Sequence, residues 1–324
     1  MLNKPRILVV SPASSASNNG NWQTAYRWAQ FLRARYHVEI AGQWDSASPP
    51  PDALIALHAR RSADSIKAYA KTGRPLVVVL TGTDLYRDIR HDEDARRSLQ
   101  LAHRLVLLQD AGVDELPATL RARTAVIYQS APALAPQPAD DGLFTVAMVG
   151  HLRGEKDPST FMQAALLATA PSLRFIQVGG ALDAALGRQA EDTAARCGNY
   201  RWLGAVEHDA SRGLLRQSRL LVVPSVMEGG ANVIVEAVTS GVPVLASDIS
   251  GNRGMLGADY AGYFPVGDAA ALARLVERAA TEPGFEKMLR DQCEARLPLF
   301  APEREKAAVL GLMDNALTQH RTTP

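Results

Sequence analysis

Residues 220–247 read LLVVPSVMEGGANVIVEAVTSGVPVLAS and predict, in order, a strand, a loop with two glycines, a helix and a second strand. Leu220 to Val223 is a short, fully apolar run, which is typical of a parallel strand covered on both faces, and Pro224 ends it. We expect the helix over 231–240 and the next strand over 242–246. Because ligands of open α/β sheets bind at the carboxyl ends of strands, we expect a functional site in the loop that follows Pro224.

The loop and the start of the helix combine the features of an anion site. Gly229 and Gly230 have no side chains, so the backbone can come close to a ligand. The helix that begins near Ala231 and Asn232 presents unpaired N–H groups and the positive end of its dipole. We therefore expect these four residues to bind a diphosphate.

Two glutamates, Glu228 and Glu236, flank the start of this helix. The helix is apolar nearly all round, so we expect it to be buried, and a buried carboxylate needs hydrogen-bond partners. A sugar or ribose diol offers two donors to a carboxylate, which only accepts, so the glutamates can hold two ends of one ligand. Alternatively, Glu228 complements the helix dipole and Glu236 bonds to backbone or to an arginine.

Composition indicates a protein that acts on small molecules. The chain has 324 residues, 47% of them hydrophobic, which favours two domains. Its 35 Lys and Arg residues balance 34 Asp and Glu residues, which argues against nucleic acid or an anionic membrane as a partner. Cys197 and Cys293 show no metal-ligand spacing, so we expect free thiols. With no signal-peptide pattern or membrane span, we expect a cytoplasmic protein.

Two sets of apolar runs alternate with helix-like stretches and predict two Rossmann-like, doubly wound α/β domains that face a cleft. We expect an N-terminal domain over 1–132, a linker over the Pro- and Asp-rich stretch 133–142, and a second domain over 143–302. The tail from about 303 to 324 is expected to be a helix. The runs that predict strands cover residues 6–10, 54–57, 76–80, 105–108, 125–128, 144–149, 173–178, 201–203, 220–223 and 242–246.

Polar stretches follow three of the N-terminal strands, where a second ligand would bind. The donor-rich loop after the first strand ends in Asn18, Asn19, Gly20 and Asn21, just before a helix predicted over 22–35. Arg60 and Arg61 follow the next run, and Thr81 and Asp84 follow the third. We expect these eight residues to bind an acceptor, with a flexible surface loop and a solvated helix start as the alternatives.

The segment EGGANVIVEAVTSGVPVLASD resembles the E-x7-E signature of the retaining glycosyltransferases of family four, which have the GT-B fold. The resemblance implies that Glu228 contacts the donor sugar and Glu236 the nucleotide ribose. It also implies a final helix that crosses back to the first domain, and a reaction that needs no metal ion and no cofactor.

A second motif of that family, G-R-L-x-x-x-K-G, resembles the stretch GHLRGEKDP that begins at residue 150. In the family its two cations hold the donor diphosphate. The resemblance places this role on Lys156, with Arg153 as the substitute for the family arginine, whose position is held by His151. Gly179 and Trp202 lie in segments similar to those near the nucleotide base, although Trp202 can equally be a core residue.

Thr81 stands where the family has the histidine of its His-Gly-x-Asp segment, so no strong general base is evident. The stretches NNGNWQTAYRW, ARRSADSI and GTDLYRDI resemble one small branch, the selenosugar synthases of selenoneine biosynthesis. This implies transfer of a sugar from UDP-N-acetylglucosamine or UDP-glucose to selenophosphate, a charged nucleophile that needs no base. The alternatives are a hydroxyl glycosyltransferase, a sugar-nucleotide epimerase and a silent sugar-nucleotide binding module.

Overall fold

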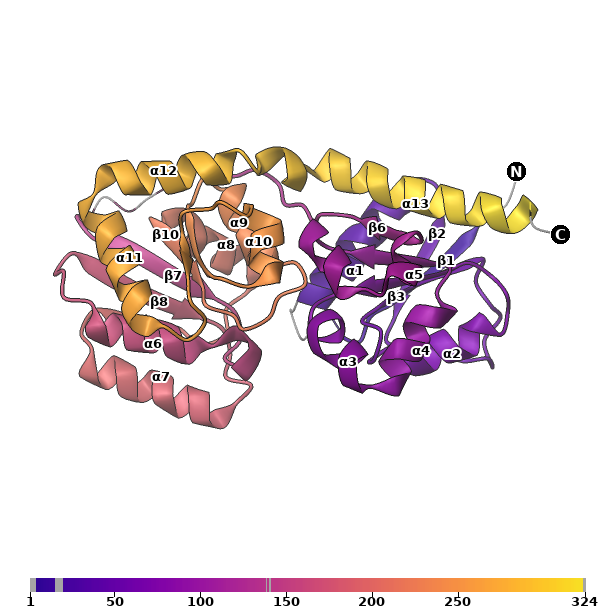
Figure 1. Ribbon diagram of the computed structural model, residues 1–324, viewed down its shortest axis with the longest axis horizontal. Coiled ribbons are helices and arrows are strands. Elements are labelled where there is room, and N and C mark those ends of the chain that lie inside the picture. The colour runs from indigo at the N-terminus through magenta and orange to yellow at the C-terminus, as the bar shows by residue number, and fades with distance from the viewer. Residues whose placement is uncertain (1–3, 15–19, 138, 140, 323–324) are drawn as a thin grey trace. The chain divides into compact units, whose positions relative to one another are not determined.

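The computed structural model describes residues 4–14, 20–137, 139 and 141–322, and these form two compact α/β units (Figure 1). The first unit comprises Met1–Gln129, Glu228–Gly230 and Ala301–Pro324, and the second comprises Ser130–Met227 and Ala231–Phe300. In the described residues each unit contains a six-stranded parallel sheet with helices around it. The prediction of two doubly wound α/β domains is confirmed.

The sheet of the first unit has the strand order β2-β1-β3-β4-β5-β6. Since β1 pairs with both β2 and β3, the strand order reverses beside β1, and the loops after β1 and β3 leave the sheet at this switch point. The strands are β1 (Arg6–Val10), β2 (His37–Ala41), β3 (Ala53–Leu57), β4 (Leu76–Leu80), β5 (Arg104–Leu107) and β6 (Thr124–Val126). The helices are α1 (Gly20–Leu32), α2 (Ala63–Ala70), η2 (Asp84–Asp88), α3 (Ile89–His91), α4 (Glu93–Leu101), η3 (Asp110–Glu115), α5 (Ala118–Arg121) and α13 (Pro302–Thr322).

Alternate residues of these strands feed two apolar clusters, one on each face of the sheet. Ile7 and Val9 pack with α1 and α13, whereas Leu8 and Val10 pack with α2 and α4. Burial on both faces explains why the strands are continuous apolar runs, because each such side chain contributes about 1.5–3 kcal/mol when it leaves water. The last helix, α13, is thereby part of the core of the first unit.

The sheet of the second unit has the order β12-β11-β10-β7-β8-β9, and its switch point lies between β7 and β10. The loops after these two strands therefore leave the sheet side by side. The strands are β7 (Phe144–Val149), β8 (Leu173–Val178), β9 (Tyr200–Trp202), β10 (Leu220–Val223), β11 (Val244–Ser247) and β12 (Tyr263–Phe264). The helices are η4 (Gly154–Lys156), α6 (Pro158–Leu167), α7 (Ala184–Arg196), α8 (His208–Gln217), α9 (Asn232–Val238), α10 (Ser250–Leu256), α11 (Ala269–Thr281), α12 (Pro283–Glu294) and η5 (Leu297–Phe300).

The stretch expected to be a linker is held against the second unit over much of its length. Leu134 donates its backbone N–H to the Thr239 carbonyl at 3.1 Å, and Gln137 donates to the Arg216 carbonyl at 2.8 Å. The Arg216 guanidinium in turn donates to the Ala135 carbonyl at 2.7 Å. Residues 133–137 therefore form a strap on α8 and α9, and the second unit begins before the expected residue 143.

Candidate functional site

Asp84 organises the loops that follow β3 and β4 in the first unit. Its Oδ1 accepts the backbone N–H groups of Thr81 and Gly82, both at 2.9 Å, and its Oδ2 accepts that of Ala59 at 2.9 Å. The side chain is fully buried. Asp84 thus holds the loops in which Thr81 lies, and its expected role in binding an acceptor stays a prediction.

His58 is a buried residue of this region that the sequence did not single out. It directly follows β3 and has a φ of 72°, a left-handed conformation that is uncommon for residues other than glycine. Its Nδ1 accepts the backbone N–H of Arg61 at 3.3 Å, and its Nε2 lies 3.0 Å from the Thr83 hydroxyl. The pKa of His58 is lowered, mainly by burial, although the nearby Asp84 carboxylate acts to raise it. The neutral ring then donates from Nε2 to Thr83.

The two arginines after β3 are both exposed, and one of them has an acidic partner. Arg60 Nε donates to Asp88 Oδ2 at 2.9 Å, so its charge is partly compensated within the first unit. Gly20 and Asn21 form the start of α1, whereas Asn18 and Asn19 lie outside the described residues. The expected role of these residues in binding an acceptor stays a prediction.

Gly229 and Gly230 pack against backbone and side-chain atoms of the first unit. A Cβ on Gly229 would lie 2.4 Å from the Thr81 carbonyl carbon and 2.5 Å from Gly82 N, and one on Gly230 would lie 2.6 Å from Leu108 Cβ. The glycines are thus needed for close packing of two loops, and the expectation that their backbone binds a diphosphate stays a prediction. The adjacent Glu228 is buried and is held beside this contact.

In the second unit, the loop after β7 carries both expected phosphate-binding cations. Arg153 and Lys156 are half-buried; Arg153 directly precedes a short 3₁₀ turn, η4, and Lys156 is the last residue of that turn. Asp157 follows it in the left-handed region, with a φ of 44°, and caps α6 by accepting the Thr160 N–H. Val226, in the loop after β10, donates its N–H to the Glu155 carbonyl at 3.0 Å. This bond fixes the two loops at the switch point to each other.

The loops after β8 and β9 are packed against the same region. Gly179 has a φ of 141°, and a Cβ there would lie 2.0 Å from the Gly150 carbonyl oxygen, so only glycine fits. Trp202 donates its indole N–H to the Gly179 carbonyl at 2.8 Å and is partly buried. His151 Nδ1 accepts the Gly180 N–H at 3.2 Å. Gly179 and Trp202 thus shape the edge of the loop that carries Arg153 and Lys156.

Helix α9 is shorter than expected, Asn232–Val238 rather than 231–240, and Ala231 precedes it as a buried residue. Its Glu236 has a side chain that is 13% exposed and lies 2.7 Å, Oε1 to Nε2, from His208 of α8. The hydrogen bond to Glu236 raises the pKa of His208, and Arg212, four residues further along α8, is also near this carboxylate. A histidine partner was not foreseen for Glu236.

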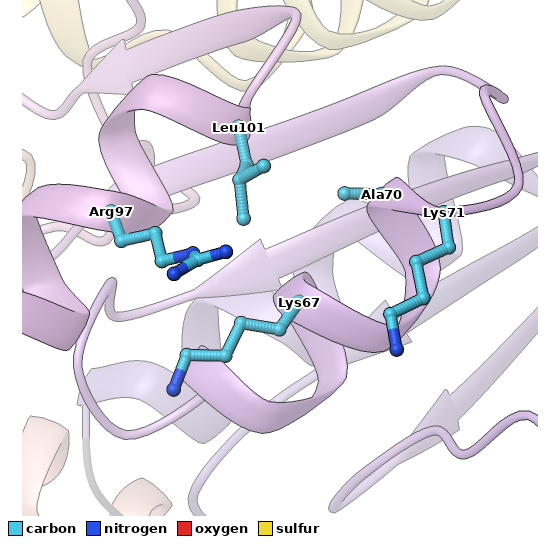
Figure 2. Close-up of a pocket in the computed structure, with 5 residues that line it drawn as sticks. All are labelled: Lys67, Ala70, Lys71, Arg97 and Leu101. Carbon is cyan, nitrogen blue, oxygen red and sulfur yellow. The ribbon is translucent and has the colours of Figure 1, made fainter.

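A cavity of about 410 Å³ lies elsewhere in the first unit, between α2 and α4 (Figure 2). Lys67, Lys71 and Arg97 line it together with Ala70 and Leu101, and Lys67 is paired with Asp94. Lys71 and Leu101 are at the ends of their helices, near the amino ends of the strands that follow. The cavity is therefore remote from the loops after β3 and β4.

Over the described ranges, none of the helices has the length and apolar character needed to cross a bilayer. In the same part of the chain, no group of three or more His, Cys, Asp or Glu side chains is arranged to hold a metal ion. Cys197 and Cys293 are both free thiols.

The family described as glycosyl transferases group 1 matches residues 133–296, which is half of the chain. Two curated relatives are D-inositol 3-phosphate glycosyltransferases. The one from Streptomyces avermitilis is 25% identical over 321 residues, and the one from Streptomyces scabiei is 25% identical over 323 residues. The alignments include 94% of this chain but only 64% and 67% of those proteins, so the chain spans about two thirds of their length.

Solved structures with a similar fold cover nearly the whole chain. Anabaena Alr3699/HepE in complex with UDP-glucose has a TM-score of 0.77 at 16% identity, over 96% of this chain and 100% of that one. Sucrose-phosphate synthase from Thermosynechococcus elongatus has a TM-score of 0.75 at 16% identity, over 98% of this chain and 100% of that one.

Proposed function

Because the chain belongs to the family of glycosyl transferases group 1, we propose that it is an enzyme that transfers a sugar from a UDP-sugar, either UDP-glucose or UDP-N-acetylglucosamine. The observation that carries the proposal is the pair of loops at the β7/β10 switch point, joined by the bond between Val226 and Glu155. One of these loops presents Arg153 and Lys156, which suit a diphosphate. HepE, a protein of the same fold, binds UDP and UDP-glucose.

The proposed roles divide the donor among a few side chains. Lys156 and Arg153 hold the diphosphate and stabilise the charge that grows on it as the bond to the sugar breaks. Glu236 accepts hydrogen bonds from the ribose hydroxyls, and Gly179 and Trp202 shape the region of the base. Glu228 contacts the sugar. Since two side-chain cations supply the positive charge, metal independence is part of the proposal.

For the acceptor we propose selenophosphate, supported by the resemblance of the N-terminal segments to selenosugar synthases. The selenium atom attacks C1 of the sugar, the bond from C1 to the UDP oxygen breaks, and UDP leaves with the electron pair. Hydrolysis of the Se–P bond of the product then gives the 1-selenosugar and phosphate. Such a nucleophile is already anionic, so the reaction needs no residue to remove a proton, in keeping with Thr81 in place of a histidine.

A second candidate acceptor is a phosphorylated polyol, because the two curated relatives are named D-inositol 3-phosphate glycosyltransferases. Both acceptors carry a phosphate group. The guanidinium of Arg61, an exposed residue in the loop after β3, suits either of them. They differ in the attacking atom, which is selenium in one and a hydroxyl oxygen in the other.

A panel of acceptors tests the proposal. UDP release from each UDP-sugar is measured with selenophosphate, thiophosphate, inositol 3-phosphate or no addition, and the product is identified by mass. Selenophosphate-dependent release with a selenosugar product is the expected result. Release with inositol phosphate alone would favour the second acceptor, and donor conversion without any acceptor would indicate an epimerase. UDP-sugar binding without turnover would indicate a binding module.

A further inference from the structure

Glu236 and His208 form a close pair within the second unit, between α9 and the first residue of α8. The distance from His208 Nε2 to Glu236 Oε1 is 2.7 Å, and the two side chains are 37% and 13% exposed. Water around the partly exposed histidine weakens the attraction between the two side chains, but the carboxylate is largely shielded from water. Oε1 is therefore held by His208, and within the part of the chain that the structure describes no hydrogen bond reaches Oε2, which can accept from other donors such as ribose hydroxyls.

Helix α8, which carries His208, is itself anchored to the segment that precedes the second sheet. Arg212 Nη2 donates to the Pro132 carbonyl at 3.0 Å, and Arg216 Nε donates to the Ala135 carbonyl at 2.7 Å. These arginines stand four and eight residues after His208, on the same side of the helix. Pro132 and the strap that follows it thus fix the helix that carries the imidazole, and a side chain that is locked in this way is pre-organised for its task.

We propose that His208 is a positioning residue for the nucleotide, which holds Glu236 through Oε1 so that Oε2 can accept hydrogen bonds from the ribose hydroxyls. The inference rests on the proposed function, because it needs a uridine nucleotide as the ligand. Without the imidazole, the Glu236 side chain would be free to adopt several rotamers until the nucleotide binds. Binding would then have to order it, and this entropy cost would lower the affinity for the nucleotide.

The charges around the pair also predict that UDP binding depends on pH. The pKa of His208 is raised, mainly by the hydrogen bond to Glu236, while desolvation lowers it. Two charged groups on α8 have opposite effects on this pKa, since Arg212 lowers it and Asp209 raises it. The positive end of the α8 dipole also disfavours a cation at its first residue, but a charge-assisted bond of 2.7 Å outweighs this effect. His208 therefore stays protonated above its ordinary pKa of about 6.5. When it loses the proton, one of its two tautomers no longer donates to Glu236, so UDP should bind more weakly.

The test compares His208→Ala and His208→Gln with His91→Ala, an exposed histidine of the first unit. Calorimetry measures the Kd of UDP and of 2′,3′-dideoxy-UDP, which lacks both ribose hydroxyls, from pH 6 to 9. For UDP we expect His208→Ala to bind about 5- to 20-fold more weakly, the effect of one indirect hydrogen bond to a charged group. His208→Gln, whose amide can donate in place of Nε2, should stay within about 3-fold of the wild type at pH 7.

The dideoxy nucleotide separates positioning from a general loss of structure. We expect all four proteins to bind it equally, and we expect the wild type, but not His208→Gln, to lose UDP affinity as pH rises through the pKa of His208. Equal losses for both nucleotides, or wild-type UDP affinity in His208→Ala, would overturn the inference and leave the proposed function intact. Absence of UDP binding by the wild type would overturn both.

Discussion

Trp28 on α1 donates its indole N–H to Glu305 Oε1 on α13 at 2.7 Å. The two residues are 277 positions apart in the sequence, so this bond links α1 to the last helix. Arg27 donates to the other oxygen, Oε2, at 2.7 Å. Glu305 is only 1% exposed, so these donors replace its water. The contact joins the last helix to the first within one hydrophobic cluster, beside Val309 and Met313.

We expect Glu305→Ala to destabilise the first unit by about 3–5 kcal/mol, because it leaves a partly buried arginine and a buried indole without their acceptor. Glu303→Ala, an exposed residue of the same helix, is the matched control and should change stability by less than about 0.5 kcal/mol. Urea unfolding followed by tryptophan fluorescence measures both. Equal stability of the two variants would show that this contact does not hold α13.

Lys156→Ala should lower kcat/KM by about 10²- to 10³-fold, because the proposed donor site would lose one preorganised charge beside the leaving diphosphate. Lys71→Ala removes the same type of side chain from the remote cavity of Figure 2 and should leave kcat/KM unchanged. Steady-state kinetics with the UDP-sugar provides the comparison. Activity close to that of the wild type in Lys156→Ala would remove this lysine from the proposed site.

Gly229→Ala should damage the position of Glu228, since the new Cβ would meet the backbone of Thr81 and Gly82 at 2.4–2.5 Å. Overpacking of this kind costs about 1–3 kcal/mol, and we expect kcat to fall more than the affinity for UDP. Gly198→Ala, where a Cβ would have no neighbour within 4 Å, is the control. If both variants melted and turned over alike, the close packing of the glycine loop would be unimportant.

His58 should make the first unit sensitive to acid. Burial lowers its pKa in the folded protein, so between the ordinary value of about 6.5 and the lowered one only the unfolded chain binds the proton. Stability is therefore full above pH 6.5 and is lost as pH falls below it. His58→Asn keeps a residue that tolerates a positive φ and should show a smaller drop in Tm between pH 7 and 5.5. An unchanged drop would contradict a neutral, buried His58.

Much of the fold could be predicted because both sheets are covered on both faces. Such strands, β10 among them, become apolar runs bounded by proline or glycine, and these are visible in sequence. The edge strand β2 was missed because His37 and Glu39 are exposed and interrupt the apolar pattern. The strand β12 was missed because it has two residues, too few for any periodicity.

The side chains of the candidate site were predictable by type but less so by role. Asp84 was visible as a polar residue after a strand, yet only its hydrogen bonds in the structure show that it holds two loops. The partnership of Glu236 with His208 spans 28 residues and two helices, so no local pattern reveals it. The left-handed conformation of His58 likewise leaves no trace in the sequence.

The division of the donor between two glutamates is tested most directly by the Kd of UDP, measured by calorimetry for the wild type, Glu236→Ala and Glu228→Ala. Loss of the proposed hydrogen bonds that the ribose hydroxyls donate to the carboxylate should weaken binding by about 1.5–3 kcal/mol in Glu236→Ala, or roughly 10- to 150-fold. Glu228→Ala, which would lose the proposed contact to the sugar, should bind UDP like the wild type while its kcat with the UDP-sugar falls. Loss of UDP binding in Glu228→Ala, or unchanged binding in Glu236→Ala, would contradict the account.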